Sequence, residues 1–292
     1  MYLPHLHLAP TSTEPSLAAG SVRGMAPDDP HTARTRAVWT AGDFDHIARG
    51  FAASAAAFID RLGLRAGERV LDVACGTGNL ALPAARAGAQ VTGLDIAPNL
   101  LETARRSADA EGLTIRFDEG NAEDLPYPAA SFDTVVTMFG AMFAARPERA
   151  AAELLRVTRP GGRIVMANWT AGGFVGQMLR AHVARVAPPP DVPGVLLWGD
   201  PAVVVERLGS AAEVTTTRRT VTFTYPYPPA GTVALFREWY GPTVRTFAAL
   251  APEAQAAFQA ELERLWTGAN RATDGTTVVE SEYLEVRAIV GG

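Results

Sequence analysis

The stretch VLDVACGTGN, residues 70–79, is an apolar run that breaks into two glycines separated by one threonine. Its valines and leucine predict a strand that is buried on both faces, as in a parallel sheet. Gly76 and Gly78 remove side chains where the backbone must bend sharply and approach a bound molecule. Asn79 is expected to cap the helix that follows. The stretch therefore predicts the first strand of an α/β sheet, followed by a turn that contacts a ligand.

A second apolar segment ends at Asp95, seventeen residues after Gly78. A carboxylate at this position can accept hydrogen bonds from both hydroxyl groups of a ribose. A glycine turn followed by such an acid indicates a ligand that contains a nucleoside.

The nucleoside could belong to a dinucleotide, because Gly76, Gly78 and Ala81 also satisfy a loose G-x-G-x-x-A pattern. Asp72 argues against this alternative. It lies inside the strand just before the turn, where a carboxylate can meet an ammonium group, whereas a dinucleotide needs room for its pyrophosphate there. The position of Asp72 favours a ligand with an amino acid end.

Four further motifs follow in order along the chain. They are GNAEDLP at residues 120–126, SFDTVV at 131–136, LLRV at 154–157 and RPGG at 159–162. With these motifs the sequence resembles the class I S-adenosylmethionine (SAM) dependent methyltransferases. The resemblance is strongest to the branch that includes the ubiquinone and menaquinone C-methyltransferases and many small-molecule methyltransferases, and it covers roughly residues 44–169.

This resemblance implies an α/β fold, namely a Rossmann-like, doubly wound, seven-stranded sheet with a helical cap insertion. It also implies SAM as cofactor, S-adenosylhomocysteine as product, and an amide at Asn121 that binds the adenine amino group through its carbonyl oxygen. A turn or helix-cap asparagine is the alternative for Asn121. The cofactor-binding residues that follow from the motifs are Asp72, Ala74, Gly76, Gly78, Asn79, Asp95, Ile96, Asn121, Ala122, Glu123, Met138 and Phe139.

The pattern of apolar residues divides the chain into four parts. Residues 1–36 are rich in Pro, Ser, Thr and Ala and are expected to be a disordered tail. Residues 37–170 form the SAM-binding core, in which residues 43–62 are expected to be one helix with a buried stripe. Residues 171–275 are expected to be a helical cap with one core strand near 214–225, and residues 276–292 to be the C-terminal strand of the core sheet. The family resemblance implies that these two strands pair antiparallel.

Composition limits the partners. All 26 basic residues are arginine and the formal charge is −5, so no basic surface for nucleic acid is expected. The single cysteine, Cys75, excludes a disulfide within the chain, and no metal site is predicted. No stretch reaches the ~18 to 20 apolar residues that span a bilayer. We therefore expect a cytoplasmic protein with a small-molecule acceptor, as a monomer or a homodimer.

Methyl transfer from a sulfonium needs a base only if the acceptor must lose a proton, and no motif surrounds a candidate base. The candidates are His46, His182, Glu238 and Tyr240, with Tyr225 and Tyr227 as further possibilities. The sequence assigns the catalytic role to none of them.

The expected cap contains many aromatic residues and few charges. These are Trp198, Phe223, Phe236, Trp239 and Phe247. They favour a small apolar or aromatic acceptor bound under a mobile cap, unless they form the core of the cap itself. Trp39 and His46 are expected beside the cofactor pocket. A second functional class remains open at this point, a SAM-binding protein of the same fold that transfers no methyl group and acts as a regulator or in SAM-assisted ring chemistry.

Overall fold

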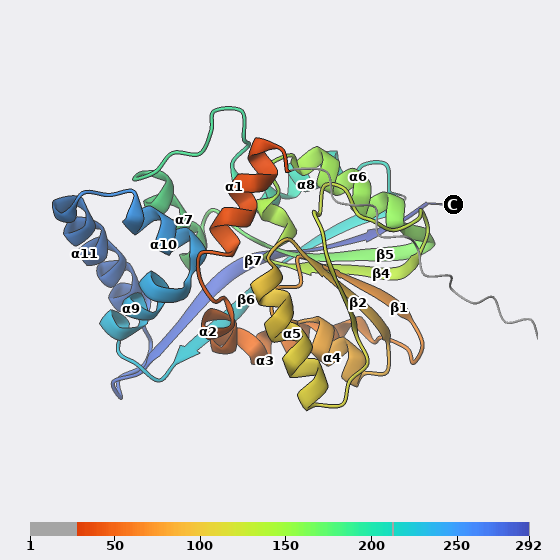
Figure 1. Cartoon of the computed structure of the whole chain (residues 1–292), viewed down its shortest axis with the longest axis horizontal. Coiled ribbons are helices and arrows are strands. Elements are labelled where there is room, and N and C mark those ends of the chain that lie inside the picture. Colours follow the sequence, from red (N-terminus) through yellow and green to blue (C-terminus); the bar gives the residue numbers. More distant parts are fainter. Residues whose placement is uncertain (1–27, 212, 292) are drawn as a thin grey trace, which may run out of the picture.

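The computed structural model describes residues 28–211 and 213–291. At its centre is a seven-stranded sheet in the order β3-β2-β1-β4-β5-β7-β6 (Figure 1). The strands are β1 (Arg69–Val73), β2 (Gln90–Asp95), β3 (Arg116–Glu119), β4 (Phe132–Met138), β5 (Thr158–Trp169), β6 (Glu213–Tyr225) and β7 (Thr277–Ile289). The neighbouring strands from β3 to β5 are parallel, and β7 runs antiparallel to both β5 and β6. The predicted fold class is confirmed.

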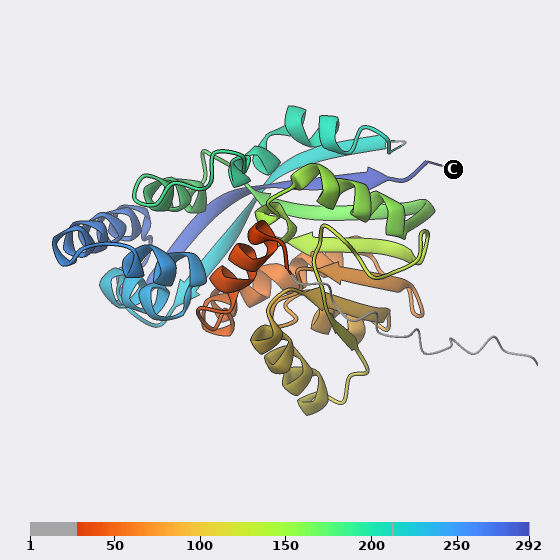
Figure 2. The same ribbon diagram turned by 45° about the horizontal axis from the view of Figure 1, so that its top comes forward.

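Eleven α-helices are seen in the described residues: α1 (Pro30–Trp39), α2 (Asp45–Ala48), α3 (Ala52–Leu62), α4 (Ala81–Arg86), α5 (Pro98–Ala110), α6 (Pro147–Val157), α7 (Phe174–Val183), α8 (Pro201–Arg207), α9 (Pro229–Trp239), α10 (Gly241–Ala248) and α11 (Pro252–Ala269). Short 3-10 turns are η1 (Arg49–Phe51), η2 (Ala141–Phe143) and η3 (Val195–Gly199). Helices α6 and α8 lie on one side of the sheet and α3, α4 and α5 on the other (Figures 1 and 2). No helix in the described ranges is long and apolar enough to cross a membrane.

The first strand is buried as its sequence predicts. Val70, Leu71 and Val73 have no exposed surface, because β2 and β4 flank β1 and helices cover both faces. The antiparallel pairing of β6 with β7 was also expected, and its register places Tyr225 opposite Thr277.

The antiparallel pair of strands β6 and β7 extends beyond the other strands, and helices α7, α9, α10 and α11 gather around its far end (Figure 1). We call these four helices the cap. Their interior is aromatic: the ring of Trp266 lies 4.6 Å from that of Phe174 and 5.0 Å from that of Phe236. The cap therefore has a core of its own.

The expected single helix at residues 43–62 is wrong, because the chain changes to the tighter η1 turn between α2 and α3. A Cβ atom at Gly50, within η1, would lie 2.3 Å from the Tyr225 ring. Tyr225 fills this space and donates a hydrogen bond to the carbonyl of Ile47 at 2.9 Å. The helix is therefore interrupted where a β6 side chain packs against its backbone.

Two local expectations also fail. Asn79 does not cap α4, since that helix begins at Ala81 and its N-cap residue is Leu80. Residues 1–27 of the expected disordered tail lie outside the described residues, but Pro30 begins α1. The Asp29 carboxylate caps this helix by accepting from the backbone N–H groups of His31 and Thr32 at 3.0 and 3.3 Å.

Candidate functional site

A cleft lies at the carboxyl ends of β1, β2 and β4, where an open α/β sheet binds its ligand. Its empty space, including the open mouth, is about 930 Å³. All of the predicted cofactor-binding residues line it except Gly78. The structure thus brings together residues from four separate segments of the chain, at 72–79, 95–96, 121–123 and 138–139.

The glycine turn and Asp95 form the floor of the cleft. Gly76 and Gly78 have φ values of +53° and +92°, which favour glycine. The N–H of Gly76 donates to Asp95 Oδ2 at 2.8 Å, and the N–H of Ala97 donates to Asp95 Oδ1 at 2.9 Å. Burial raises the pKa of Asp95, while these backbone bonds and the charge of Arg36 act in the opposite direction. Each oxygen of Asp95 keeps a lone pair with which it can accept a ligand hydroxyl.

Two buried polar atoms in the cleft have no hydrogen-bond partner among the described residues. They are Asp72 Oδ2 and Asn79 Nδ2, an acceptor and a donor. Burial raises the pKa of Asp72 well above its usual value and the neighbouring Asp95 adds to this effect, while the backbone N–H of Ala81 acts in the opposite direction. A buried carboxylate oxygen without a partner is costly, so the site fits a ligand that brings a positive charge. The amino acid end of SAM has an ammonium group for Asp72 and a carboxylate for a donor such as Asn79.

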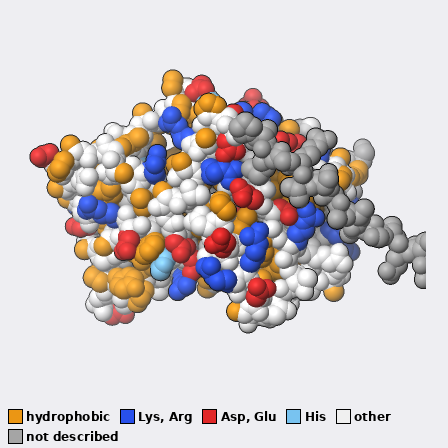
Figure 3. Space-filling view, viewed as in Figure 1, with side chains coloured by type: hydrophobic (Ala, Val, Ile, Leu, Met, Phe, Trp, Pro, Cys, Tyr) orange, Lys and Arg blue, Asp and Glu red, His pale blue; other side chains and the backbone are white. Residues whose placement is uncertain are grey.

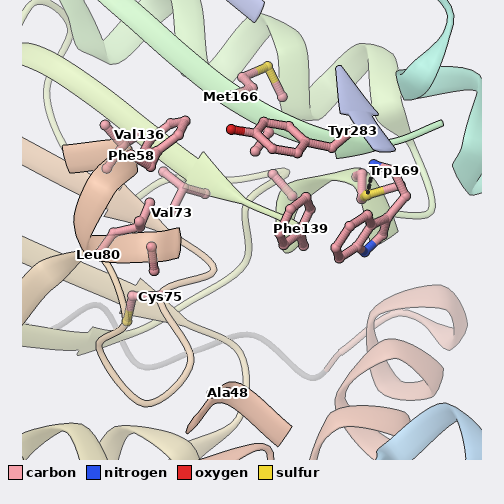
Figure 4. Close-up of a cluster of buried hydrophobic side chains, with 14 of the residues drawn as sticks. Ala48, Phe58, Val73, Cys75, Leu80, Val136, Phe139, Met166, Trp169 and Tyr283 are labelled. Atoms are coloured by element: carbon pink, nitrogen blue, oxygen red, sulfur yellow. Dashed lines mark hydrogen bonds between the residues drawn. The ribbon is translucent and has the colours of Figure 1, made fainter. Parts of the chain in front are cut away.

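Two non-glycine residues at the cleft adopt the left-handed backbone conformation. Ala74 follows β1 with φ +56°, and Phe139 follows β4 with φ +58°. Such conformations cost about 1–3 kcal/mol and concentrate at functional sites. The Phe139 ring stacks on Trp169 with centroids 3.5 Å apart (Figure 4), and its N–H donates to the carbonyl of Ala167 at 2.9 Å. Phe139 is therefore held firmly as a wall of the cleft.

Helix α1 supplies the opposite wall. Thr32, Thr35 and Trp39 line the cleft from one face of the helix. The amide of Asn121 donates from Nδ2 to Thr32 Oγ1 at 3.0 Å and accepts at Oδ1 from the N–H of Glu123 at 3.0 Å. Asn121 thus makes the turn-type bond of the alternative interpretation, while it also faces the cleft as the resemblance implies.

Glu123, one of the predicted cofactor-binding residues, is buried. Its carboxylate accepts from the backbone N–H of Arg146 at 3.0 Å and from the guanidinium of the same residue at 2.5 Å. Arg146 also donates to Asp29 at 2.6 Å, just before α1. The loop after β3, the start of α6 and the N-terminal segment are therefore linked beside the cleft.

None of the candidate bases lines the cleft. His182 is enclosed between the carbonyl of Met178 and the hydroxyl of Thr243, at 2.7 and 2.8 Å, and burial lowers its pKa to about 4. Tyr240 is buried, which raises its pKa, and His46 stacks on Trp239 with ring centroids 4.4 Å apart. Glu238 is exposed.

The two further tyrosines do not line the cleft either. Tyr225 holds the backbone of Ile47, and Tyr227 is exposed. The catalytic role therefore stays unassigned among the described residues.

The aromatic residues that the sequence analysis expected in the cap do not line the cleft. Phe223, Phe236 and Phe247 are buried inside the cap or against the sheet, and Trp198 packs under Arg207, 4.7 Å from its guanidinium carbon. Besides Trp39 and the predicted Phe139, the aromatic part of the cleft is lined by Phe44, Phe51 and Phe143, which sequence reasoning did not name as site residues. It also missed α1, although Asp29–Pro30 is the same helix-start signal that precedes α8 at Asp200–Pro201.

Comparison with known proteins identifies the family of the chain. Residues 71–166 match a family model described as a methyltransferase domain. An uncharacterised protein of Mycobacterium tuberculosis is 37% identical over 264 residues, which cover 89% of this chain and 96% of the relative. The demethylmenaquinone methyltransferase of Thermus thermophilus is 44% identical over 128 residues, or 42% of this chain and 58% of that enzyme. The chain belongs to the class I SAM-dependent methyltransferases.

The fold agrees with this assignment. The solved structure of a putative methyltransferase from Bacillus halodurans matches with a TM-score of 0.56 at 18% identity, and the match covers 82% of this chain and all of that one. The methyltransferase uses SAM as its cofactor, and this assignment supersedes the alternative of a binding protein without methyl transfer.

Proposed function

We propose that the methyltransferase acts on a small, neutral, aromatic or similarly flat apolar acceptor, which binds between the cofactor and α1. The observation that carries this proposal is a chain of aromatic rings along one side of the cleft. Trp39 lies 5.0 Å from Phe143 and 5.9 Å from Phe44, measured between ring centroids. Phe44 continues to Phe51 at 6.2 Å, and Phe51 to Phe139 at 6.0 Å. Such rings bury the faces of a flat acceptor and exclude water from it.

The charges of the cleft support a neutral acceptor. Among the described residues that line it, the acidic ones are Asp72, Asp95 and Glu123, and no arginine or histidine is present. An anionic acceptor would approach these carboxylates with no lining arginine or histidine to receive its charge. The name of the partial relative from Thermus thermophilus, a demethylmenaquinone methyltransferase, is consistent with a ring-containing acceptor.

In this proposal the floor of the cleft holds the cofactor. Asp72 receives the ammonium group, Asp95 accepts from the ribose hydroxyls, and Asn121 lies beside the adenine. Met138 and Phe139 then bring the end of β4 to the amino acid end of the cofactor. The rigid stacking of Phe139 on Trp169 keeps the boundary between cofactor and acceptor at a fixed place.

SAM supplies a methyl group on a sulfonium, which is already a good leaving group. The protein contributes orientation and a dry environment, and correct orientation alone is worth up to about 7–11 kcal/mol. The left-handed Phe139 and the aromatic chain around it serve these two purposes. No protein base is assigned, so the proton that a phenol, hydroquinone or aromatic amine loses on methylation passes to water at the mouth of the cleft.

A paired acceptor screen tests the proposal. Each neutral phenol, hydroquinone or aromatic amine would be assayed beside an analogue that carries a carboxylate, and S-adenosylhomocysteine release would be measured. We expect turnover with members of the neutral set and at least tenfold lower kcat/KM for their charged analogues. Equal turnover of both members, or preference for the carboxylates, would contradict the acceptor class. Tight SAM binding without product release from any compound would contradict the proposed acceptor chemistry as a whole.

A further inference from the structure

Helix α1 covers the cleft but is held in place in an unusual way. Over its ten residues only Thr32 is buried, and its sequence PHTARTRAVW has no continuous apolar stripe. At about 1.5 Å per residue the helix is roughly 15 Å long, enough to cross the mouth of a nucleoside site. In both ribbon views α1 lies between the cap and α5 (Figures 1 and 2).

The two ends of α1 are attached by different interactions. Its C-terminal end is apolar, since Trp39 packs against Phe143 and Tyr240. The carbonyl of Val38 also lies against Gly241, where a Cβ atom would come within 2.1 Å of it. The C-terminal end is therefore fixed to the cap by close contact.

The segment before this aromatic end is held by charges. Arg146 donates to Asp29, just before the helix, at 2.6 Å. Arg36, in the last turn of the helix, pairs with Glu119 at the end of β3 and also donates to Asp28 of its own segment at 2.7 Å. Positive and negative side chains are interspersed over this face of the molecule (Figure 3). Partly exposed ion pairs of this kind are weak and are screened by salt.

These same contacts reach the cofactor-facing residues. Arg36 Nη1 donates to the carbonyl of Ile96, the residue next to Asp95. Thr32 Oγ1 donates to Asp29 Oδ2 at 2.9 Å, so its lone pairs accept from Asn121 Nδ2. Helix α1 therefore fixes the orientation of the Asn121 side chain. Arg36 fixes the backbone next to Asp95, the carboxylate that is expected to bind the ribose.

We propose that Thr32 and Arg36 are positioning residues of the SAM site, and that the charged part of α1, from Asp29 to Arg36, detaches to admit SAM and release S-adenosylhomocysteine. The aromatic end is the pivot, at Trp39 to Gly42. Docking of α1 orients Asn121 and the Asp95–Ile96 backbone, so cofactor binding and closure of the helix stabilise each other. This inference rests on the cofactor placement proposed above.

The test uses S-adenosylhomocysteine binding and needs no acceptor. Arg36→Gln removes the charge, Arg36→Lys keeps it, and Thr32→Val removes only the hydroxyl group. The matched control is Arg86→Gln, which breaks the surface ion pair between Arg86 and Glu111 on α4 and α5, away from the cleft. Dissociation rates would be followed by stopped-flow tryptophan fluorescence, affinities by calorimetry, and α1 by amide hydrogen exchange.

We expect Arg36→Gln and Thr32→Val to speed dissociation at least tenfold, with the melting temperature of the ligand-free protein no lower than that of the control. Arg36→Lys should restore part of the affinity. In the wild type, binding should protect residues 30–39 from exchange, and salt should speed dissociation more than it does in Arg36→Gln. Thr32→Val gives the same test if Arg36→Gln does not fold.

Unchanged dissociation in both variants, with the same exchange at residues 30–39 in the presence and absence of ligand, would overturn the inference. Asp72→Asn and Asp95→Ala distinguish its failure from that of the cofactor placement. If these two variants weaken binding and the α1 variants do not, only the role of α1 is wrong. If all four bind like the wild type, the placement itself is wrong.

Discussion

Helix α1 and the cap both lie beside the open ends of the strands, but different forces hold them (Figure 2). The cap is rich in aromatic residues, and these pack on one another, as Trp266 does on Phe174 and Phe236. Helix α1 is polar up to Arg36, where ion pairs with Arg146 and Glu119 hold it, and it lines the cleft through Thr32, Thr35 and Trp39.

The difference shows how a protein divides apolar surface between stability and function. A segment that buries large rings in its own core has few of them left for a ligand. A segment held by weak polar contacts can detach and return at low cost, which suits a wall that a cofactor must pass. The sequence favoured an acceptor bound under the cap aromatics, whereas none of the cap residues lines the described cleft.

The largest effect should come from the cap interior. Trp266→Ala removes a side chain that is 1% exposed, and we expect a loss of about 3–5 kcal/mol in the free energy of unfolding. The affinity for SAM should stay within about twofold of the wild type, or 0.4 kcal/mol. Denaturant unfolding and calorimetry would measure the two quantities. A large loss of affinity with little loss of stability would mean that the cap belongs to the binding site.

Acid should also act on the cap through His182. Its folded-state pKa of about 4 lies below the ordinary value of 6.5, so the unfolded chain binds the proton more readily. The stability that neutral His182 provides is present above about pH 6.5 and is lost as the pH falls toward 4, by about 3 kcal/mol. In His182→Gln the free energy of unfolding should fall less steeply over this range. Parallel curves for the two proteins would show that His182 is not buried in its neutral form.

The floor of the cleft should show a binding effect of intermediate size. Asp72→Asn removes the charge that faces the cofactor ammonium, and we expect SAM affinity to fall by about 2 kcal/mol. Because burial raises the pKa of Asp72, wild-type affinity should decrease as the pH falls and this carboxylate is protonated. The variant should lack this pH dependence in calorimetric titrations. If its affinity follows the same pH curve as the wild type, another group receives the ammonium.

The smallest effect should separate two tryptophans that lie close to each other in space. Trp39 lines the cleft, whereas Trp239 stacks on His46 outside it. Trp39→Ala should raise the KM for an aromatic acceptor about tenfold, equal to about 1.4 kcal/mol, and Trp239→Ala should leave it unchanged. Steady-state assays on both variants provide the measurement. The reverse order would place the acceptor against the cap and make the comparison of the two regions wrong.

The sequence by itself determined the elements whose signals are local. The run at residues 70–79, the carboxylate at Asp95 and the alternation of strands and helices predict a buried strand, a ligand-binding turn and a doubly wound sheet. Strand β6 was predicted from period-two alternation, which survives in any context that buries one face. Its antiparallel pairing with β7 followed from the resemblance to the methyltransferase family. The residues at the floor of the cleft could be predicted because each of their motifs requires a particular local backbone conformation.

Only the tertiary structure decided what covers the cleft. The contacts that place α1 join residues far apart in the chain, such as Arg36 with Ile96 and Arg146 with Asp29, and no local periodicity encodes them. The break at η1 arises likewise from Tyr225 of a distant strand. Aromatic composition could not tell whether a ring faces a ligand or a neighbouring ring, because both environments bury the same surface. That choice depends on how the segments pack in space. Here the aromatic side chains of the cap pack on one another, and Trp39 lines the cleft.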